Sequence, residues 1–174
     1  MAAVVIGILL IIASAMKEKS SDKITVKDLN KKFSSYRKSL LGAFLDKKKL
    51  KKEMKKIAEE AKTKKDLPRL FVMHFNGDIK ASAVESLRET VTAVLSVAQK
   101  TDEVVIVLES PGGMVHGYGL AASQLLRIKD AGLKLTVCVD KVAASGGYMM
   151  ACLADKIISA PFAIIGSVGV VASV

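Results

Sequence analysis

The stretch VVIVLESPGG, residues 104–113, joins a continuous apolar run to a turn rich in proline and glycine. A second stretch, KLTVCVDKVAASGG, residues 134–147, has the same design. Runs of β-branched and aliphatic residues predict buried strands, and each glycine-rich turn stands where its strand ends. Binding sites in open α/β sheets gather at the carboxyl ends of the strands, so we expect the two turns to face one pocket.

Strands and helices alternate outward from these two stretches. The sequence predicts strands over residues 70–75, 104–108, 133–139 and 156–159. It predicts helices over residues 84–98 and 118–131, and a third helix that opens at Ser145. This order is typical of an α/β domain with repeated right-handed crossovers. Because the run 104–108 is apolar without interruption, we expect that strand to be covered on both faces.

An uncharged apolar run, AAVVIGILLIIASAM, occupies residues 2–16. As a helix it would span about 22 Å at ~1.5 Å per residue, against a hydrocarbon core of about 30 Å. One alternative is a signal-peptide core, because Ala13-Ser14-Ala15 resembles a cleavage site; another is a buried helix. The absence of a basic segment before the run favours a membrane anchor, which we expect over residues 1–16.

Positive charge is concentrated behind that run. Residues 17–66 hold 18 Lys and Arg against 8 Asp and Glu, whereas the rest of the chain is balanced. A basic block behind an apolar run favours a membrane surface over nucleic acid, and we expect no nucleic-acid partner. Lysines behind an anchor also favour the cytoplasmic side for this segment, but the side that holds the α/β domain is left open.

Apolar residues recur at near-helical spacing among the lysines of residues 41–61, which predicts one amphipathic helix. Its basic face is either a solvated stalk or a surface that docks on a membrane or a partner. Pro68 follows it, and the residue before a proline is pushed out of helical geometry. The predicted organisation is therefore an anchor at 1–16, a basic, partly helical stalk at 17–68 and an α/β domain at 69–174.

The two cysteines, Cys138 and Cys152, lie in apolar surroundings, so we expect buried thiols rather than a disulfide. His74 and His116 are the only histidines, and neither C-x-x-C nor H-x-x-x-H occurs. We therefore expect no metal site. His74 lies within a predicted strand, where a packed or strand-face histidine is favoured over a catalytic one.

Ser145 and three glycines make the candidate site. Ser145 begins a predicted helix, whose N-terminal dipole favours developing negative charge, so it is the candidate nucleophile. Backbone N–H groups around Gly112, Gly113 and Gly146 are the candidate oxyanion hole. Ser-Gly-Gly alone is equally typical of a helix cap or a tight turn. A second such turn, one helix and one strand away, makes the pair more specific.

Two segments, LESPGGMVHGYGLAASQL and VDKVAASGGYMMACLADKIISAPFAIIGSVGVV, resemble the core of the protease IV, or signal peptide peptidase A, family. The resemblance implies a Clp-protease/crotonase type of fold, built from repeated β-β-α turns, and assembly into oligomers. It implies a serine endopeptidase of the bacterial inner membrane that needs no cofactor and cleaves peptide or membrane-protein substrates. It also matches Ser145 to the nucleophile, and Gly112, Gly113 and Gly146 to the oxyanion region.

The family's serine–lysine dyad exposes a gap, because its lysine lies some tens of residues beyond the serine. The sole lysine after Ser145 is Lys156, at the start of a predicted strand, and neither its position nor its context matches. Lys141 lies upstream, where a structural or solvent role is favoured, and His116 is a weaker candidate for the base. We therefore expect the chain to be truncated and inactive by itself. Alternatives are a crotonase-like acyl-thioester enzyme and a non-catalytic membrane scaffold.

Overall fold

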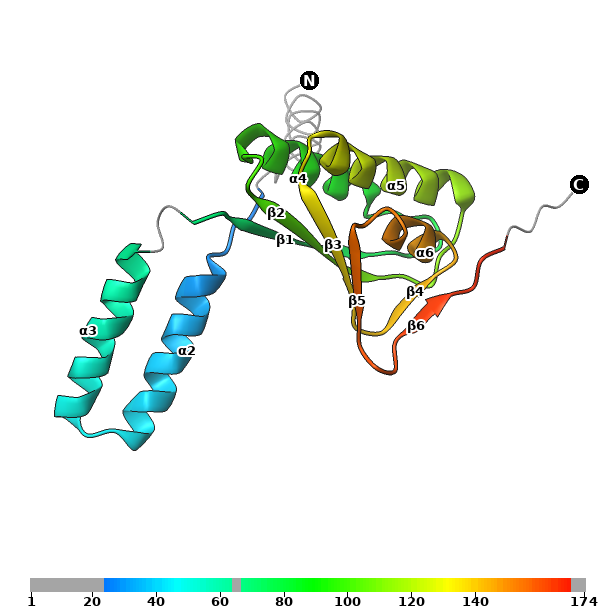
Figure 1. Ribbon diagram of the computed structural model, residues 1–174. Helices are drawn as coiled ribbons and strands as arrows, with labels where there is room; N and C mark the ends of the chain where they lie inside the picture. Colours follow the sequence, from blue (N-terminus) through cyan, green and yellow to red (C-terminus); the bar gives the residue numbers. More distant parts are fainter. Residues whose placement is uncertain (1–23, 64–66, 170–174) are drawn as a thin grey trace, which may run out of the picture. The chain divides into compact units, whose positions relative to one another are not determined.

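The computed structural model describes residues 24–63 and 67–169, and these form two compact units, one ending at Thr63 and one beginning at Lys64 (Figure 1). The predicted anchor at residues 1–16 lies outside the described residues. Within the described ranges, no helix is both long enough and apolar enough to span a membrane.

The first unit is a helical hairpin of α2 (Leu29–Phe44) and α3 (Lys47–Thr63). The prediction of one amphipathic helix across residues 41–61 was therefore wrong. The chain turns at Leu45, whose backbone is extended (φ −105°, ψ 142°), and Asp46 then accepts the Lys49 N–H at 2.9 Å. An aspartate in this position caps a new helix, so the apolar residues before and after Asp46 belong to two different helices.

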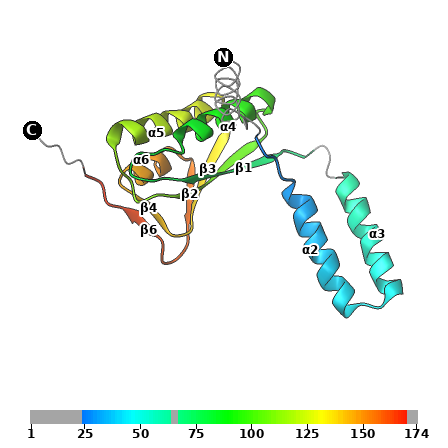
Figure 2. The same cartoon turned by 180° about the vertical axis from the view of Figure 1, so that it is seen from behind.

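The second unit is built on a parallel sheet of strands β1 (Leu70–Asn76), β2 (Glu103–Glu109), β3 (Lys134–Val139) and β5 (Lys156–Ser159), in that spatial order. The intervening helices are α4 (Val84–Val97), α5 (Val115–Asp130) and α6 (Gly146–Ala151). Figures 1 and 2 show α4 and α5 over one face of this sheet. The α/β class predicted from the sequence is confirmed.

A second, two-stranded sheet pairs β4 (Val142–Ala144) with β6 (Ile164–Gly166) in parallel. β4 follows β3 directly and precedes α6, and β6 follows β5 in the same way. The described residues thus contain one β-β-α turn, β3-β4-α6, of the kind that the family resemblance implied, and a second pair of strands, β5-β6, in the same order. The sequence did not predict β4 as a strand, because three residues with a single β-branched side chain carry too little pattern.

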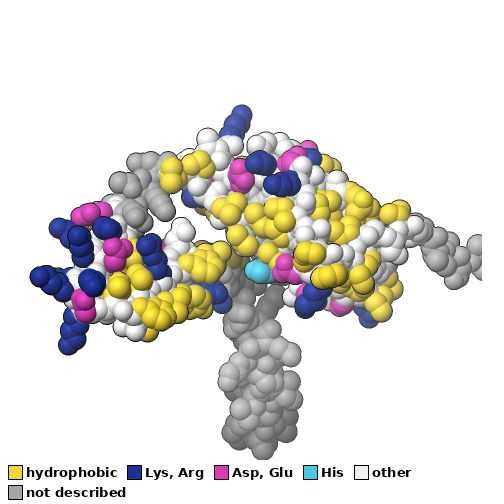
Figure 3. Space-filling model, turned by 60° about the horizontal axis from the view of Figure 1, so that its bottom comes forward, with side chains coloured by type: hydrophobic (Ala, Val, Ile, Leu, Met, Phe, Trp, Pro, Cys, Tyr) yellow, Lys and Arg dark blue, Asp and Glu magenta, His cyan; other side chains and the backbone are white. Residues whose placement is uncertain are grey.

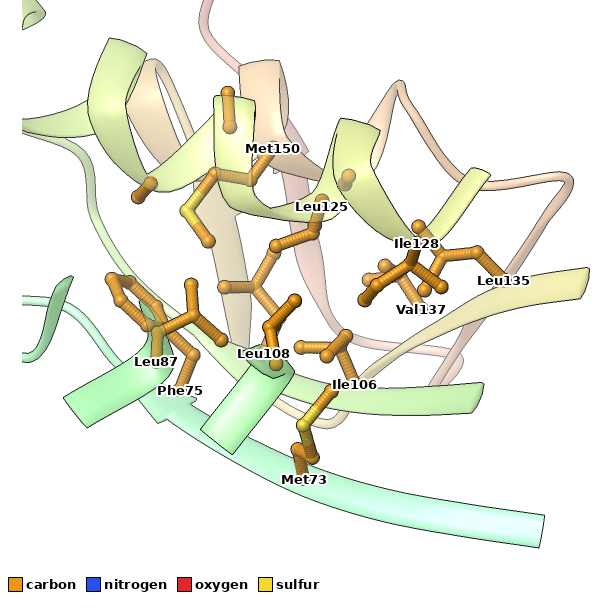
Figure 4. Close-up of a cluster of buried hydrophobic side chains, with 14 of the residues drawn as sticks. Met73, Phe75, Leu87, Ile106, Leu108, Leu125, Ile128, Leu135, Val137 and Met150 are labelled. Atoms are coloured by element: carbon orange, nitrogen blue, oxygen red, sulfur yellow. The ribbon is translucent and has the colours of Figure 1, made fainter. Parts of the chain in front are cut away.

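The core lies between the main sheet and the helices, where side chains from the strands meet those of α4, α5 and α6 (Figure 4). Along β2, Val104, Ile106 and Leu108 are fully buried, whereas Val105 and Val107 between them are only half-buried. The expectation of a strand covered on both faces was therefore wrong. α4 and α5 cover one face, so the side chains that alternate toward the other face keep access to solvent.

The two cysteines are free, and neither is fully buried, contrary to the expectation. Cys152 is exposed where α6 ends, and Cys138 is half-buried on β3, where burial raises the pKa of its thiol. His74 is exposed on β1, between the buried Met73 and Phe75. It is thus a strand-face histidine, on the side of β1 that points away from the core.

Candidate active site

The two glycine-rich turns lie side by side. Ser110, directly after β2, forms a parallel bridge with Ala143 of β4. The Ser110 N–H donates to the Val142 carbonyl at 2.9 Å, and the Ala144 N–H donates to the Ser110 carbonyl at 2.9 Å. These two hydrogen bonds join the turn that follows β2 to the strand that leads into Ser145. The structure therefore brings together the segments that the sequence analysis expected to face one pocket.

Gly112 lies tightly against the second turn. Its φ is +89°, in the left-handed region that favours glycine. A Cβ at this position would lie 2.7 Å from the Ala144 carbonyl oxygen and the Ser145 Cβ, and 2.8 Å from the Gly146 nitrogen. These distances are shorter than van der Waals contact, so only a residue without a side chain allows the first turn to lie against Ser145.

Ser145 occupies the junction between β4 and α6 in a strained conformation. Its φ of 50° and ψ of −115° are sparsely populated by residues that carry a Cβ. Such conformations cost about 1–3 kcal/mol and are concentrated at functional sites. The Ser145 N–H donates to the Gly166 carbonyl of β6 at 2.8 Å, which holds the residue in place. Its side chain makes no capping hydrogen bond to α6, so the helix-cap interpretation of Ser-Gly-Gly does not apply.

The backbone N–H groups of the three glycines differ in what they contact. The Gly112 N–H donates to the Ser110 Oγ at 3.1 Å. By contrast, no described residue accepts a hydrogen bond from the N–H of Gly113 or of Gly146. Gly113 is exposed and Gly146 is half-buried, so both remain available to an oxygen atom of a ligand. Gly112 therefore shapes the turn, whereas Gly113 and Gly146 keep their donors.

Tyr118, on the first turn of α5, supports both glycine-rich turns. Its hydroxyl lies 2.5 Å from the Ser110 Oγ and donates to the Asp78 carbonyl at 2.8 Å. Its ring packs against Gly146 so closely that a Cβ there would overlap it. The Tyr118 side chain is fully buried, and this burial raises the pKa of its hydroxyl, which keeps the donor protonated.

Two models of known protein families together match nearly the whole chain. A family model described as Peptidase family S49 N-terminal matches residues 1–125, and one described as Peptidase family S49 matches residues 127–174. The chain belongs to peptidase family S49. The family resemblance stated from the sequence is thereby confirmed.

Curated relatives of this S49 chain carry the same name in two organisms. "Probable protease SohB" of Haemophilus influenzae is 66% identical over 105 residues, which cover 60% of this chain and 30% of the relative. "Probable protease SohB" of Buchnera aphidicola subsp. Acyrthosiphon pisum is 60% identical over 111 residues, which cover 64% of this chain and 33% of the relative. The chain thus spans about a third of the length of these relatives.

Among solved structures, a mutant of ClpP1 from Listeria monocytogenes aligns with 54% of this S49 chain and 50% of its own chain. The sequence identity is 19% and the TM-score is 0.37.

Three residues that are candidates for the base lie within the described part of the chain: Lys141, Lys156 and His116. Lys141 is exposed, and its Nζ lies 3.0 Å from both carboxylate oxygens of Glu109. Lys156 pairs with Thr136 at the amino-terminal end of the sheet, whereas the glycine-rich turns follow the carboxyl ends. His116 is exposed on α5. In this S49 chain, therefore, neither lysine stands in the desolvated surroundings that a neutral amine base requires.

Two residues of the site were missed by the sequence analysis. Ser110 and Tyr118 connect the turn after β1, the turn after β2 and the start of α6. A serine just before Pro-Gly-Gly is itself a turn signal, because its hydroxyl can accept an N–H two residues later. Nothing in the sequence pairs it with a tyrosine eight residues later, because that contact depends on how α5 packs.

Proposed function

We propose that the protein is a serine endopeptidase in which Ser145 is the nucleophile. The Ser145 Oγ attacks a peptide carbonyl carbon, and its proton passes to a base. The carbon–nitrogen bond then breaks, the amine leaves with a proton from the base, and the acyl group stays on Ser145. Water hydrolyses this ester in a second step that regenerates the serine.

The observation that carries this proposal is the close approach of Gly112 to Ser145 and Gly146. It brings the donor-bearing turn against a serine whose backbone is strained and whose hydroxyl caps nothing. The N–H groups of Gly113 and Gly146, which no described residue uses, are the proposed oxyanion donors. Removing one such donor typically costs about 3–4 kcal/mol of transition-state stabilisation.

The proposed base is a lysine outside the described residues. An amine acts as a base near neutral pH when desolvation lowers its pKa, and Lys141 is instead exposed and paired with Glu109. We place the base in sequence that follows residue 174 or on a neighbouring subunit of an oligomer. Either arrangement gives residues 1–174 little activity by themselves.

The proposed setting is the bacterial inner membrane, with residues 1–16 as a single-pass anchor. Residues 17–68 form the basic stalk, and residues 69–174 form the N-terminal part of the peptidase domain. Peptides or membrane proteins are the proposed substrates, and a homo-oligomer is the proposed assembly. The uncharged run at residues 2–16 and the basic block behind it support this arrangement.

Active-site labelling tests the proposal. A fluorophosphonate probe should label the protein expressed from its complete gene, and Ser145→Ala should abolish the label. Ser123→Ala, which removes an exposed hydroxyl from α5, is the matched control and should label like the wild type. Labelling that persists in Ser145→Ala would show that another residue is the nucleophile. Lack of labelling together with coenzyme A binding would favour an acyl-thioester enzyme instead.

A further inference from the structure

The hairpin helix α2 carries two separate apolar faces. One face holds Leu41 and, just past the end of the helix, Leu45; both are half-buried in the groove between α2 and α3. α3 presents Leu50, Met54 and Ile57 at the same level of burial. The large apolar residues of α3 thus share the partial burial of Leu41 and Leu45, whereas other large apolar residues of α2 do not.

The other face of α2 is a stripe of large apolar side chains that remain exposed. Spaced four, three, four and four residues apart, they lie along one side of the helix. The members of this stripe are Leu29, Phe33, Tyr36, Leu40 and Phe44. Phe33 is 60% exposed, Leu40 is 63% exposed and Phe44 is 81% exposed. No residue of α2 is classed as buried, so the stripe is not part of a core within this unit.

Positive charge lies beside the stripe and is abundant in the hairpin as a whole. The Lys32 Nζ lies 5.9 Å from the ring centroid of Phe33 and 5.7 Å from that of Tyr36. Residues 24–63 hold 13 Lys and Arg against 5 Asp and Glu. Three of these five acids are already paired with lysines of the hairpin. Figure 3 shows the Lys and Arg side chains crowded on the hairpin, at the left of the view, beside its hydrophobic side chains.

We propose that this stripe docks the hairpin on an anionic lipid surface. The aromatic and aliphatic side chains of α2 enter the headgroup region, and the lysines of the hairpin contact lipid phosphates. Charge complementarity selects this occupant. A second copy of the hairpin would bring like charge against like charge, and nucleic acid offers no apolar layer for Phe33, Leu40 and Phe44. The proposal does not depend on the catalytic role of Ser145.

The chain contains no tryptophan, so a single introduced tryptophan can report on the stripe by its fluorescence. Phe44→Trp places the reporter on the stripe, and Phe162→Trp places a matched reporter at a 99% exposed position of the α/β unit. With phosphatidylcholine vesicles that contain phosphatidylglycerol, emission from Phe44→Trp should shift to shorter wavelength and be quenched by brominated acyl chains. The Phe162→Trp emission should not change. High salt should reverse the shift, since screening weakens contacts with the lipid phosphates.

Vesicles of phosphatidylcholine alone separate this docking from membrane attachment by residues 1–16. An anchor attaches both variants to either vesicle, but only a docked stripe moves the emission of Phe44→Trp, and only with anionic lipid. Equal emission on both vesicles would overturn the proposal. So would a shift that appears without lipid and grows with protein concentration, because that result assigns the stripe to self-association. Adding Phe33→Ser and Leu40→Ser to the reporter variant should abolish the lipid-dependent shift.

Discussion

The hydroxyl of Ser110 donates a hydrogen bond to the hydroxyl of Tyr118 across 2.5 Å. The direction follows from the partners, because Tyr118 has one proton and the Asp78 carbonyl can only accept it. Ser110 in turn accepts the Gly112 N–H at 3.1 Å. One directional chain of hydrogen bonds therefore runs from Gly112 through two buried hydroxyls to the turn after β1. It fixes the position of the turn that carries the proposed oxyanion donor of Gly113.

Replacing Tyr118 with phenylalanine tests this chain. The change leaves the Ser110 hydroxyl and the Asp78 carbonyl without their partner, and an unsatisfied buried group costs about 1–3 kcal/mol. We expect denaturant unfolding to show a free energy of unfolding that is lower by that amount, and amide hydrogen exchange to be faster at Gly112. Tyr36→Phe removes the same atom from an exposed ring of α2 and should change neither quantity. Unchanged exchange at Gly112 in Tyr118→Phe would contradict the role given to this chain.

Gly112→Ala should lower the free energy of unfolding and abolish fluorophosphonate labelling of Ser145. Alanine pays about 1–2 kcal/mol for the left-handed conformation, and the overlap with Ala144, Ser145 and Gly146 adds about 1–3 kcal/mol. Gly132→Ala is the control, because Gly132 also has a positive φ, of 75°, but a Cβ there meets nothing within 4 Å. Thermal unfolding of the two variants separates strain from contact. A loss equal to that of Gly132→Ala would rule out the contact.

Gly146→Ala should displace the ring of Tyr118, since the new methyl group would overlap it. We expect lower stability and slower fluorophosphonate labelling, because the ring and the start of α6 cannot both keep their positions. Gly119→Ala, on the exposed side of α5 with nothing within 4 Å, should instead stabilise the protein by up to about 1 kcal/mol. Opposite signs in thermal unfolding are the expected outcome, and equal signs would refute this account of Gly146.

Asp102 should make the stability of the α/β unit depend on acidic pH. The Arg69 guanidinium, followed by the amides of Gln99 and Arg69, lowers the pKa of the Asp102 carboxyl from 3.8 to about 2. A depressed pKa means that the folded state favours the carboxylate. The stabilisation is therefore complete above about pH 4 and is lost as the pH falls through about 2. Asp102→Asn should lower the thermal midpoint at pH 7 and make it less dependent on pH between 4 and 2.

The control for Asp102 is Glu89→Gln, which removes a carboxylate from an exposed position of α4. It should leave the pH profile of the thermal midpoint like that of the wild type. A profile for Asp102→Asn that still falls as steeply as the wild type between pH 4 and 2 would assign the acid sensitivity to other carboxylates.

Lys141→Met should leave labelling of Ser145 unchanged. The Lys141 ammonium is exposed and paired with Glu109, so its loss removes a surface ion pair worth no more than about 1 kcal/mol. The labelling rate of the protein expressed from its complete gene is the measurement. A large drop in that rate, with stability intact, would make Lys141 the base and remove the need for a lysine outside the described residues.

The sequence predicted the main sheet because its strands are apolar runs of aliphatic, aromatic or β-branched residues, separated by recognisable helices. It predicted one helix in place of α2 and α3, because apolar residues recur at near-helical spacing on both sides of Asp46. The five-residue step from Leu45 to Leu50, which shifts the apolar face, was the signal of a break. It missed β4, whose three residues are a strand only because they pair with Ser110 and with β6. Local pattern carries little information about such pairings.

Some features of the candidate site could likewise be predicted from the sequence, and others could not. Ser145 and the glycines could be recognised because a strand followed by a glycine-rich turn is a local signal. The different contacts of the Gly112 and Gly113 N–H groups could not, since they depend on which N–H meets the Ser110 hydroxyl. Tyr118 acts across 8 residues to Ser110 and 40 residues to Asp78, so its contribution appears only when α5 packs on the sheet.

The hydrogen bond from the Ser145 N–H to the Gly166 carbonyl makes the support of the Ser145 backbone depend on sequence that is synthesised later. The ribosome makes Ser145 first, and the strand that clamps its backbone follows about twenty residues later. A nascent chain that has emerged only as far as α6 carries the serine without this clamp. The strained backbone of Ser145 therefore gains its full support only after β6 has left the ribosome. Within the two glycine-rich turns, the proposed nucleophile is thus among the last residues to be held in place.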